Sequence, residues 1–171
     1  QFGYSVAISG DYAIVGASNE DSNSITDPSN NDASNSGAAY IFKRNSGAET
    51  WVQKAYLKKE SNIGNNNQFG YSVAMSGDYA ILGANGEDSY AGAAYIFKTS
   101  DSGETWTQKA QLKALNTEVG DQFGYSVAIS GDYAIVGASY EASNSITDPS
   151  NNSIAGSGAA YIFKTSDSGE T

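Results

Sequence analysis

One stretch of seventeen residues decides the fold, because it occurs three times. Residues 1–17 read QFGYSVAISGDYAIVGA, residues 68–84 read QFGYSVAMSGDYAILGA, and residues 122–138 repeat the first version letter for letter. Two further blocks recur: GAAYIFK at 37–43, 92–98 and 158–164, and ETWVQKAYLK at 49–58, which returns as ETWTQKAQLK at 104–113. Such periodicity indicates a repeat architecture. We assign the repeats to residues 1–67, 68–121 and 122–171, the third ending before its tryptophan.

Each repeat predicts four short strands, which in the first copy are Phe2–Ser9, Tyr12–Ala17, Ala38–Lys43 and Thr50–Leu57. The first two are joined by Gly10-Asp11, which suits a type II′ hairpin turn. Small residues in the first strand suit a crowded central axis, and lysines in the fourth suit an outer edge. The sequence therefore predicts an all-β fold of four-stranded antiparallel propeller blades. A closed propeller needs roughly four to eight blades, so we expect a longer protein or several chains.

Composition excludes several classes of function. Nine basic and nineteen acidic residues give a net charge of -10, which disfavours nucleic acid and anionic membrane surfaces. The chain has no Cys and no His, so zinc sites, thiol nucleophiles and imidazole bases are absent. No apolar run approaches the roughly 20 residues that span a bilayer, so we expect no direct membrane insertion. The Asn-, Ser- and Gly-rich composition without Cys favours a secreted or cell-surface location.

A family resemblance rests on paired motifs in each copy: Phe2-Gly3 with Val15-Gly16-Ala17, Phe69-Gly70 with Leu82-Gly83-Ala84, and Phe123-Gly124 with Val136-Gly137-Ala138. The chain resembles FG-GAP repeats, the blades of the integrin α-subunit head, and most closely the bacterial type with GDYAIVGA and GAAYIFK. The resemblance implies a β-propeller on an exported or cell-surface protein that works in adhesion, ligand recognition or architecture. The implied partners are a protein or glycan at the cell surface, or further copies or blades of the chain itself.

The chain departs from the integrin pattern at the calcium loop. Integrin blades that hold calcium use an Asp-rich loop between the first two strands, whereas here that connection is only Ser-Gly-Asp in every copy. Those ligands cannot be transferred to this chain. Ser18, Asn85 or Ser139 stands where the family motif ends in Pro.

The loops between the second and third strands carry half of the acids that remain after the three hairpin aspartates. Calcium prefers six to eight oxygen ligands, which such loops could supply. A solvated rim that keeps the protein soluble is the alternative interpretation. No other cofactor is predicted. The calcium candidates are Glu20, Asp21, Asp27, Asp32, Glu87, Asp88, Glu141 and Asp148.

Residues that recur in every copy have structural interpretations. The hairpin aspartates are explained by turn chemistry instead of catalysis. The FG phenylalanines and the tyrosines of GAAYIFK predict packing between blades, with a sugar-stacking platform as the alternative, and the two tryptophans share this interpretation. The glycines before the second-strand alanine predict close backbone approach or a strained turn, and not phosphate binding. These sets are Asp11, Asp78 and Asp132; Phe2, Phe69 and Phe123; Tyr40, Tyr95 and Tyr161; Trp51 and Trp106; Gly16, Gly83 and Gly137.

The favoured function is binding through the variable loops. From Gly16 to Gly37 and from Gly137 to Gly158 the step is 21 residues, but from Gly83 to Gly92 it is 9. Insertions at one loop position mark a surface rim. An architectural subunit or spacer is the alternative, and a non-catalytic accessory domain of a carbohydrate-active enzyme is a remote one. We expect no enzymatic activity, because every acid either recurs in each blade or lies in a loop, unlike an asymmetric catalytic pair.

Overall fold

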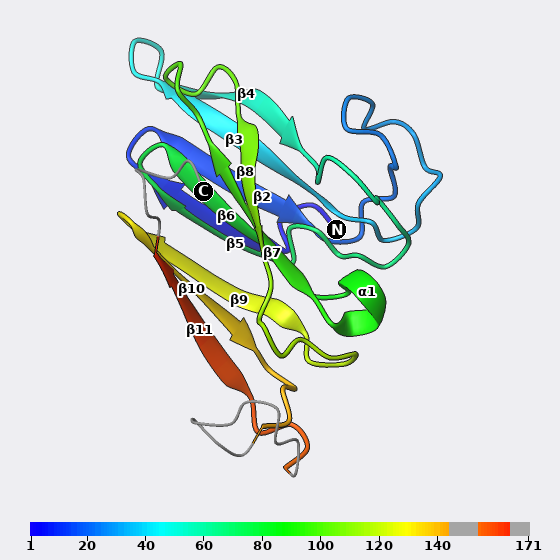
Figure 1. The fold of residues 1–171 in the computed structure, drawn as a ribbon. Coiled ribbons are helices and arrows are strands. Elements are labelled where there is room, and N and C mark those ends of the chain that lie inside the picture. The colour runs from blue at the N-terminus through cyan, green and yellow to red at the C-terminus, as the bar shows by residue number, and fades with distance from the viewer. Residues whose placement is uncertain (144–153, 165–171) are drawn as a thin grey trace.

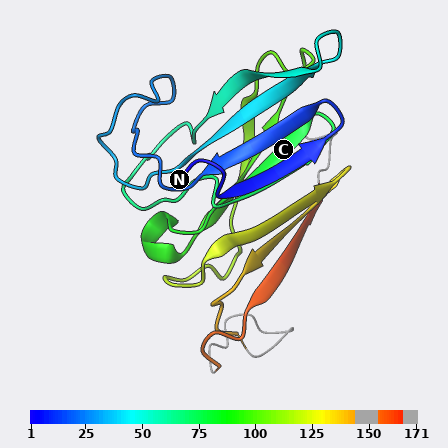
Figure 2. The same ribbon diagram turned by 180° about the vertical axis from the view of Figure 1, so that it is seen from behind.

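The computed structural model describes residues 1–143 and 154–164 and consists of antiparallel sheets (Figures 1 and 2). The first sheet has the order β1 (Ser5–Ser9), β2 (Tyr12–Ala17), β3 (Ala38–Asn45) and β4 (Thr50–Leu57). The second has β5 (Ser72–Ser76), β6 (Tyr79–Ala84), β7 (Ala93–Lys98) and β8 (Thr107–Leu112). The third has β9 (Phe123–Ser130), β10 (Tyr133–Ala138) and β11 (Ala159–Lys164). The predicted all-β, blade-like architecture is confirmed.

The three sheets lie side by side along their first strands, with β1 next to β5 and β5 next to β9. Tyr4, Tyr71 and Tyr125 follow this line, with ring centroids 4.9 Å and 5.2 Å apart. β4 and β8 form the opposite edges of the first two sheets. The expected blade geometry, with the first strand inside and the fourth outside, is therefore present.

The tight hairpins follow the predicted turn chemistry. Ser9 pairs with Tyr12, so only Gly10 and Asp11 lie between β1 and β2. Gly10 has a φ of 56° and Asp11 does not have a positive φ, which is the pattern a type II′ turn requires. The first strand was predicted to begin at Phe2, but β1 begins at Ser5. In the first copy the amides of Gly3 and Tyr4 both bond the Gly16 carbonyl and the Phe-Gly pair precedes the ladder, whereas in the third copy β9 begins at Phe123, as predicted.

Neighbouring sheets touch backbone to backbone at the repeat glycines. A Cβ built on Gly16 would lie 2.1 Å from the Gly70 carbonyl oxygen, and one on Gly83 would lie 1.9 Å from that of Gly124. The preceding sheet's serine completes each contact, as in the 2.8 Å bond from Ser72 Oγ to the Gly124 oxygen. The predicted close approach is thus confirmed at Gly16 and Gly83.

The phenylalanine of each FG motif directly precedes the glycine whose carbonyl makes this contact. Phe69 and Phe123 are 1% and 0% exposed, and each ring packs edge-on against aromatic rings of its own sheet, as Phe69 does against Phe97 at 6.0 Å. Phe2 is 63% exposed, since no described sheet precedes it. Phe69 shares a buried cluster with Ile14 of the first sheet, and Phe123 shares one with Ile81 of the second, so packing between blades is confirmed for these two phenylalanines but not for Phe2.

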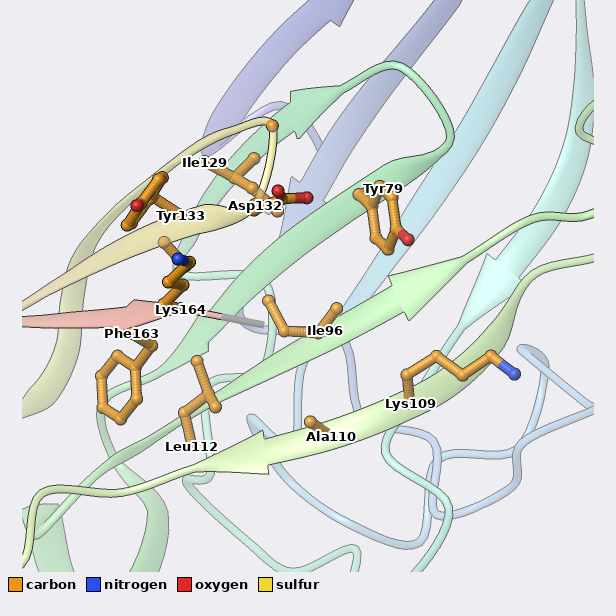
Figure 3. A pocket seen from close by; sticks show the side chains of 12 residues that line it. Tyr79, Ile96, Lys109, Ala110, Leu112, Ile129, Asp132, Tyr133, Phe163 and Lys164 are labelled. Carbon is orange, nitrogen blue, oxygen red and sulfur yellow. The ribbon is translucent and has the colours of Figure 1, made fainter. Parts of the chain in front are cut away.

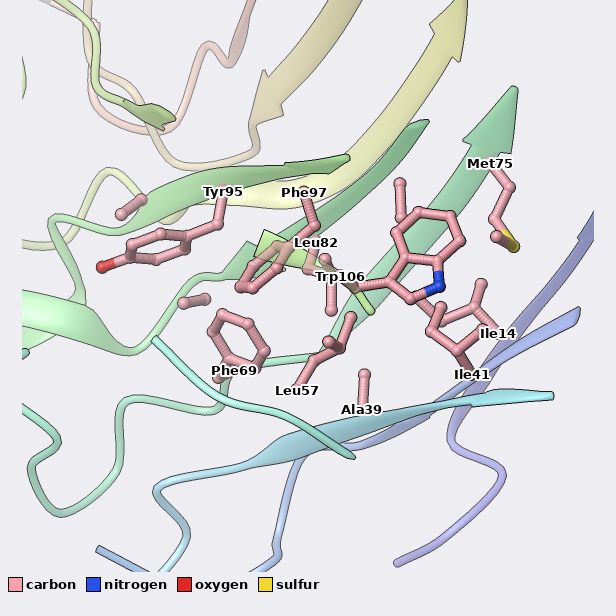
Figure 4. Packing of buried hydrophobic residues seen from close by; sticks show 13 residues of the cluster. Ile14, Ala39, Ile41, Leu57, Phe69, Met75, Leu82, Tyr95, Phe97 and Trp106 are labelled. Atoms are coloured by element: carbon pink, nitrogen blue, oxygen red, sulfur yellow. The ribbon is translucent and has the colours of Figure 1, made fainter. Parts of the chain in front are cut away.

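Trp106 is buried between the first and second sheets, where it contacts Tyr12 with ring centroids 5.8 Å apart (Figure 4). It lies at the end of the loop that connects β7 to β8 and reaches across to β2 and β3. Its repeat equivalent Trp51 is 42% exposed. The interface prediction therefore holds for Trp106 alone.

Among the described residues no helix is long and apolar enough to cross a membrane, and α1 (Glu87–Tyr90) has four residues.

We predict that Gly83→Ala destabilises the fold by about 2 to 3 kcal/mol, because its methyl group would collide with the Gly124 carbonyl. Gly137 occupies the same position in the third repeat, and a Cβ there would approach only the flexible Ser126 hydroxyl within 3.4 Å. Gly137→Ala is therefore the matched control and should change stability much less. Urea denaturation of both variants checks this. Equal losses would show that the contact between sheets does not govern the glycine position.

Candidate functional site at the loop rim

The candidate site is the set of loops that follow the second strand of each sheet, here called the rim: residues 18–37, 85–92 and 139–158, of which 144–153 lie outside the described part. These loops leave their sheets at equivalent strand ends, because β2, β6 and β10 hold the same place in the three sheets (Figure 1). The middle loop contains α1, in which Asp88, Ser89 and Tyr90 all have positive φ.

One glutamate anchors each rim loop. Glu20, Glu87 and Glu141 accept backbone hydrogen bonds on their carbonyls from the glycine that precedes the third strand, at 2.8, 2.9 and 2.8 Å. Their side chains turn inward, and Glu87 and Glu141 are 4% and 2% exposed. Sequence reasoning grouped these residues with the other loop acids. The missed signal was their fixed position, four residues after the repeat glycine in every copy.

In the first loop, Glu20 is held by a buried lysine. Lys58 Nζ lies 2.6 Å from Glu20 Oε2 and also donates to the Ser36 hydroxyl at 2.6 Å and the Gly37 carbonyl at 2.7 Å. Burial lowers the pKa of Lys58, while the bond to Glu20 acts in the opposite direction. The other oxygen, Glu20 Oε1, accepts from the Tyr56 hydroxyl at 3.2 Å. Both ends of the loop are thereby fixed to β4.

In the second loop the cation comes from a different position. Lys59 Nζ lies 3.0 Å from Glu87 Oε2, which also accepts from the Tyr95 hydroxyl at 2.6 Å. Burial, followed by the nearby Glu87 charge, raises the pKa of Tyr95 far above its ordinary value. Gln111 Nε2 donates to the other oxygen at 2.9 Å. Lys59 precedes β5 in the chain, so the anchor joins the first and second repeats.

In the third loop an amide replaces the cation. Asn116 Nδ2 donates to Glu141 Oε1 at 2.9 Å, and the Ser143 amide donates to Oε2 at 3.0 Å. The Tyr161 hydroxyl in turn donates to Asn116 Oδ1 at 3.0 Å. An inward-facing carboxylate, buried at Glu87 and Glu141 and 12% exposed at Glu20, thus recurs in all three loops, but its charge compensation differs in each.

The other calcium candidates do not gather into one site. Asp21 accepts from the Asn35 amide, Asp27 from the Ser29 amide and hydroxyl, and Asp32 from the Asn30 side chain. Asp88 pairs with Lys113, which lowers the pKa of Asp88. Asp148 lies outside the described residues. Within residues 1–143 and 154–164, no three acidic side chains lie close enough together to hold a metal ion.

Calcium at Glu20 or Glu87 would therefore have to displace the ammonium group of Lys58 or Lys59. The solvated-rim alternative also fails for Glu87 and Glu141, because both are buried.

The hairpin aspartates Asp11 and Asp78 form contacts within their own sheets. Asp11 forms a 2.7 Å ion pair with Arg44, and the carbonyls of Asp11 and Asp78 accept backbone bonds from Arg44 and Thr99.

A model of the FG-GAP repeat matches residues 1–42, 51–97 and 106–163, which is most of the chain. The chain belongs to the FG-GAP repeat family. A search of curated proteins found no match to it. The second and third matched segments begin at Trp51 and Trp106 and end in the third strand of the following sheet. The second and third matched segments therefore each cross from one sheet into the next, so that the tryptophan and the FG motif of such a segment lie in adjacent sheets.

The FG-GAP rim presents exposed aromatic and apolar groups among polar ones. Tyr90 is 43% exposed, Tyr140 60% and Ile25 50%, and each lies in a different loop. Asn and Ser make up much of the remaining rim. Tyrosine with small polar residues is the composition of antibody binding loops, because rigid aromatic rings supply contact area and the small residues supply adaptable hydrogen bonds. The rim is thus chemically suited to bind a polar macromolecular surface.

We predict that Lys58→Met destabilises the FG-GAP fold by about 3 kcal/mol, because it leaves the Glu20 carboxylate buried without its cation. Lys113 is the repeat equivalent of Lys58, but its side chain is 34% exposed and lies 3.9 Å from Glu87 Oε1, whereas Lys59 is the closer cation, 3.0 Å from the other oxygen of that carboxylate. Lys113→Met is the matched control and should lose no more than about 1 kcal/mol. Chemical denaturation at neutral pH compares the two. A smaller loss for Lys58→Met than for Lys113→Met would contradict the anchoring role.

Proposed function

We propose that this chain is the binding part of a secreted or cell-surface FG-GAP β-propeller, which recognises a protein or glycan through its rim in adhesion or ligand recognition. One observation carries the proposal. The three sheets share strands, turns and anchoring glutamates, while the step between the flanking glycines is 9 residues in the second rim loop instead of 21, and this loop exposes different groups from the first and third. A fixed frame that presents variable loops is the usual arrangement of a binding surface.

The proposal favours binding over catalysis. A glycosidase-type mechanism needs two carboxyl groups on either side of a bond, one of them free to donate a proton. The buried rim glutamates instead accept hydrogen bonds from Lys58, from Lys59 and Tyr95, or from Asn116. Calcium remains part of the proposal only through the exposed loop acids, which would have to approach one another to serve as its ligands.

The binding proposal is tested by screening the chain on a glycan array and a panel of cell-surface proteins, with calcium and with EDTA. We expect the double variant Tyr90→Ser with Tyr140→Ser to lower the affinity for a ligand found in the screen by about tenfold or more. Tyrosines that become buried when a partner binds often supply much of the binding free energy. Trp51→Ser is the control, because Trp51 is an exposed aromatic residue at the opposite end of its sheet. Binding that survives the rim variant, or that is lost equally in the control, would contradict the proposal.

An architectural role is the second candidate, and the outer faces of the first and third sheets favour it. Ile8 is 69% exposed, whereas its equivalent Met75 is 9% exposed between sheets. On the opposite face, Ile162 is 73% exposed and its equivalent Ile41 is fully buried. Apolar faces of this kind are typical of a surface that another blade or another copy covers.

The architectural role predicts concentration-dependent association of the chain. Light scattering should detect a mass above that of the monomer, and Ile8→Asp should reduce it. Ile25→Asp changes an exposed isoleucine of the rim and should leave it unchanged. A monomer at all concentrations, or equal effects of both variants, would exclude association through these faces.

A further inference from the structure

Three tyrosines, here called the tyrosine row, cross the inner edges of the three sheets. Tyr4, Tyr71 and Tyr125 hold the same position in the three repeats, directly after the FG motif. The ring centroids of Tyr4 and Tyr71 are 4.9 Å apart and those of Tyr71 and Tyr125 are 5.2 Å apart, with the rings tilted by 46° and 47°. Each pair therefore joins two neighbouring sheets at the distance at which aromatic rings touch.

The backbone holds the rings of the tyrosine row in this arrangement. The amides of Tyr4 and Tyr71 donate to the carbonyls of Gly16 and Gly83, each at 3.1 Å. These are the two glycines at which neighbouring sheets touch backbone to backbone. The contact that sets the spacing of the sheets thus also sets the spacing of the rings.

The hydroxyl groups of the tyrosine row lie next to one another. Tyr4 is 47% and Tyr125 is 42% exposed, and Tyr71 is half-buried between them. Burial, followed by the neighbouring hydroxyls of Tyr4 and Tyr125, raises the pKa of Tyr71 above its ordinary value, so Tyr71 is a neutral phenol at neutral pH. The ortho carbons of a phenol flank the carbon that carries the hydroxyl. Neighbouring hydroxyls therefore bring the ortho carbons of adjacent rings close together.

The repeated tyrosines at the start of the second strands are arranged differently. Tyr79 and Tyr133 lie apart along the apolar groove between the second and third sheets (Figure 3). Each of these rings has a lysine ammonium group over it, that of Lys98 5.0 Å and that of Lys164 5.5 Å from the ring centroid. Repetition of a tyrosine does not by itself produce ring contacts, so the tyrosine row is a specific feature of the inner edges.

Two phenols in contact can be joined by oxidation. A one-electron oxidant removes one electron and one proton from each phenol, and the two phenoxyl radicals form a carbon–carbon bond between their ortho carbons. The two ring hydrogens at the new bond then move to the oxygens, which restores both hydroxyls. A peroxidase supplies the oxidising equivalents by reducing one hydrogen peroxide to two waters. The chain has no Cys and its single methionine, Met75, is 9% exposed, so no thiol competes for the oxidant.

We propose that the tyrosine row is an oxidative cross-linking site, at which a peroxidase acting with hydrogen peroxide joins Tyr71 covalently to Tyr4 or to Tyr125. The bond links two neighbouring sheets of a chain that has no cysteine. It closes a loop of 67 residues through Tyr4 or of 54 residues through Tyr125, and so lowers the conformational entropy of the unfolded chain. This site does not depend on the rim or on the function proposed for it.

The test treats the dilute 171-residue chain with a peroxidase and hydrogen peroxide and digests the monomer fraction with trypsin. We expect mass spectrometry to detect the peptide of Tyr71 joined to that of Tyr4 or Tyr125 with the loss of two hydrogen atoms, and fragmentation to place the bond at Tyr71. The cross-linked monomer should also melt about 5 °C or more above the untreated monomer. The peptides that carry the three tyrosines in chain order are 1–43, 60–98 and 114–164.

A conservative variant separates the tyrosine row from the other tyrosines. Tyr71→Phe removes the central hydroxyl but keeps the ring, so the chain should fold as before and both cross-links should be abolished. Tyr133→Phe is the matched control, because Tyr133 is 51% exposed and lies outside the tyrosine row. This variant should leave the yield of cross-linked monomer unchanged.

Any of four results would overturn the proposal. Three are a monomer without a cross-link at Tyr71, an equal yield in Tyr71→Phe, and an equal yield when urea unfolds the chain before oxidation. The fourth is a cross-link confined to Tyr40 and Tyr56, whose ring centroids are 5.4 Å apart within the first sheet. None of these measurements involves ligand binding at the rim, so the two proposals fail separately.

Discussion

The contact between a backbone carbonyl and a glycine of the neighbouring sheet governs this structure. The Gly70 and Gly124 carbonyl oxygens lie where Gly16 and Gly83 would otherwise carry a Cβ, and a serine hydroxyl bonds each oxygen. Because this contact fixes the spacing of the sheets, a phenylalanine can be buried behind it. The indole of Trp106 then fills the wider space further out between the sheets.

The rim depends on this frame through its buried glutamates. A carboxylate removed from water must be compensated, and the chain compensates it with Lys58, with Lys59 and Tyr95, or with Asn116. Since the backbone of each glutamate also accepts a bond from the glycine before the third strand, the loop ends are fixed while the loop tips vary. A common anchor therefore allows different exposed groups in each sheet.

Much of the fold was predictable because local chemistry dictates it. Tyr12–Ala17 and Thr50–Leu57 are strands with the predicted bounds, since alternation and a two-residue turn fix them. β1 begins later than predicted, after the point where the amides of Gly3 and Tyr4 share the Gly16 carbonyl. For the site, the sequence pointed to Glu20, Glu87 and Glu141 among the loop acids, but not to their inward orientation and anchoring contacts. Their compensating groups come from distant parts of the chain, which periodicity within one loop does not reveal.

The sequence alone determined the repeat, the hairpins, the glycine positions and the FG-GAP family, because each is written as a local pattern three times over. Only the tertiary structure decided which of the equivalent residues are buried. Phe2 and Phe69 have identical neighbours on the chain, as do Ile14 and Ile135, yet one member of each pair is exposed and the other buried. The difference lies in whether another sheet packs against the residue, and that is a property of the assembly of sheets and not of the local sequence.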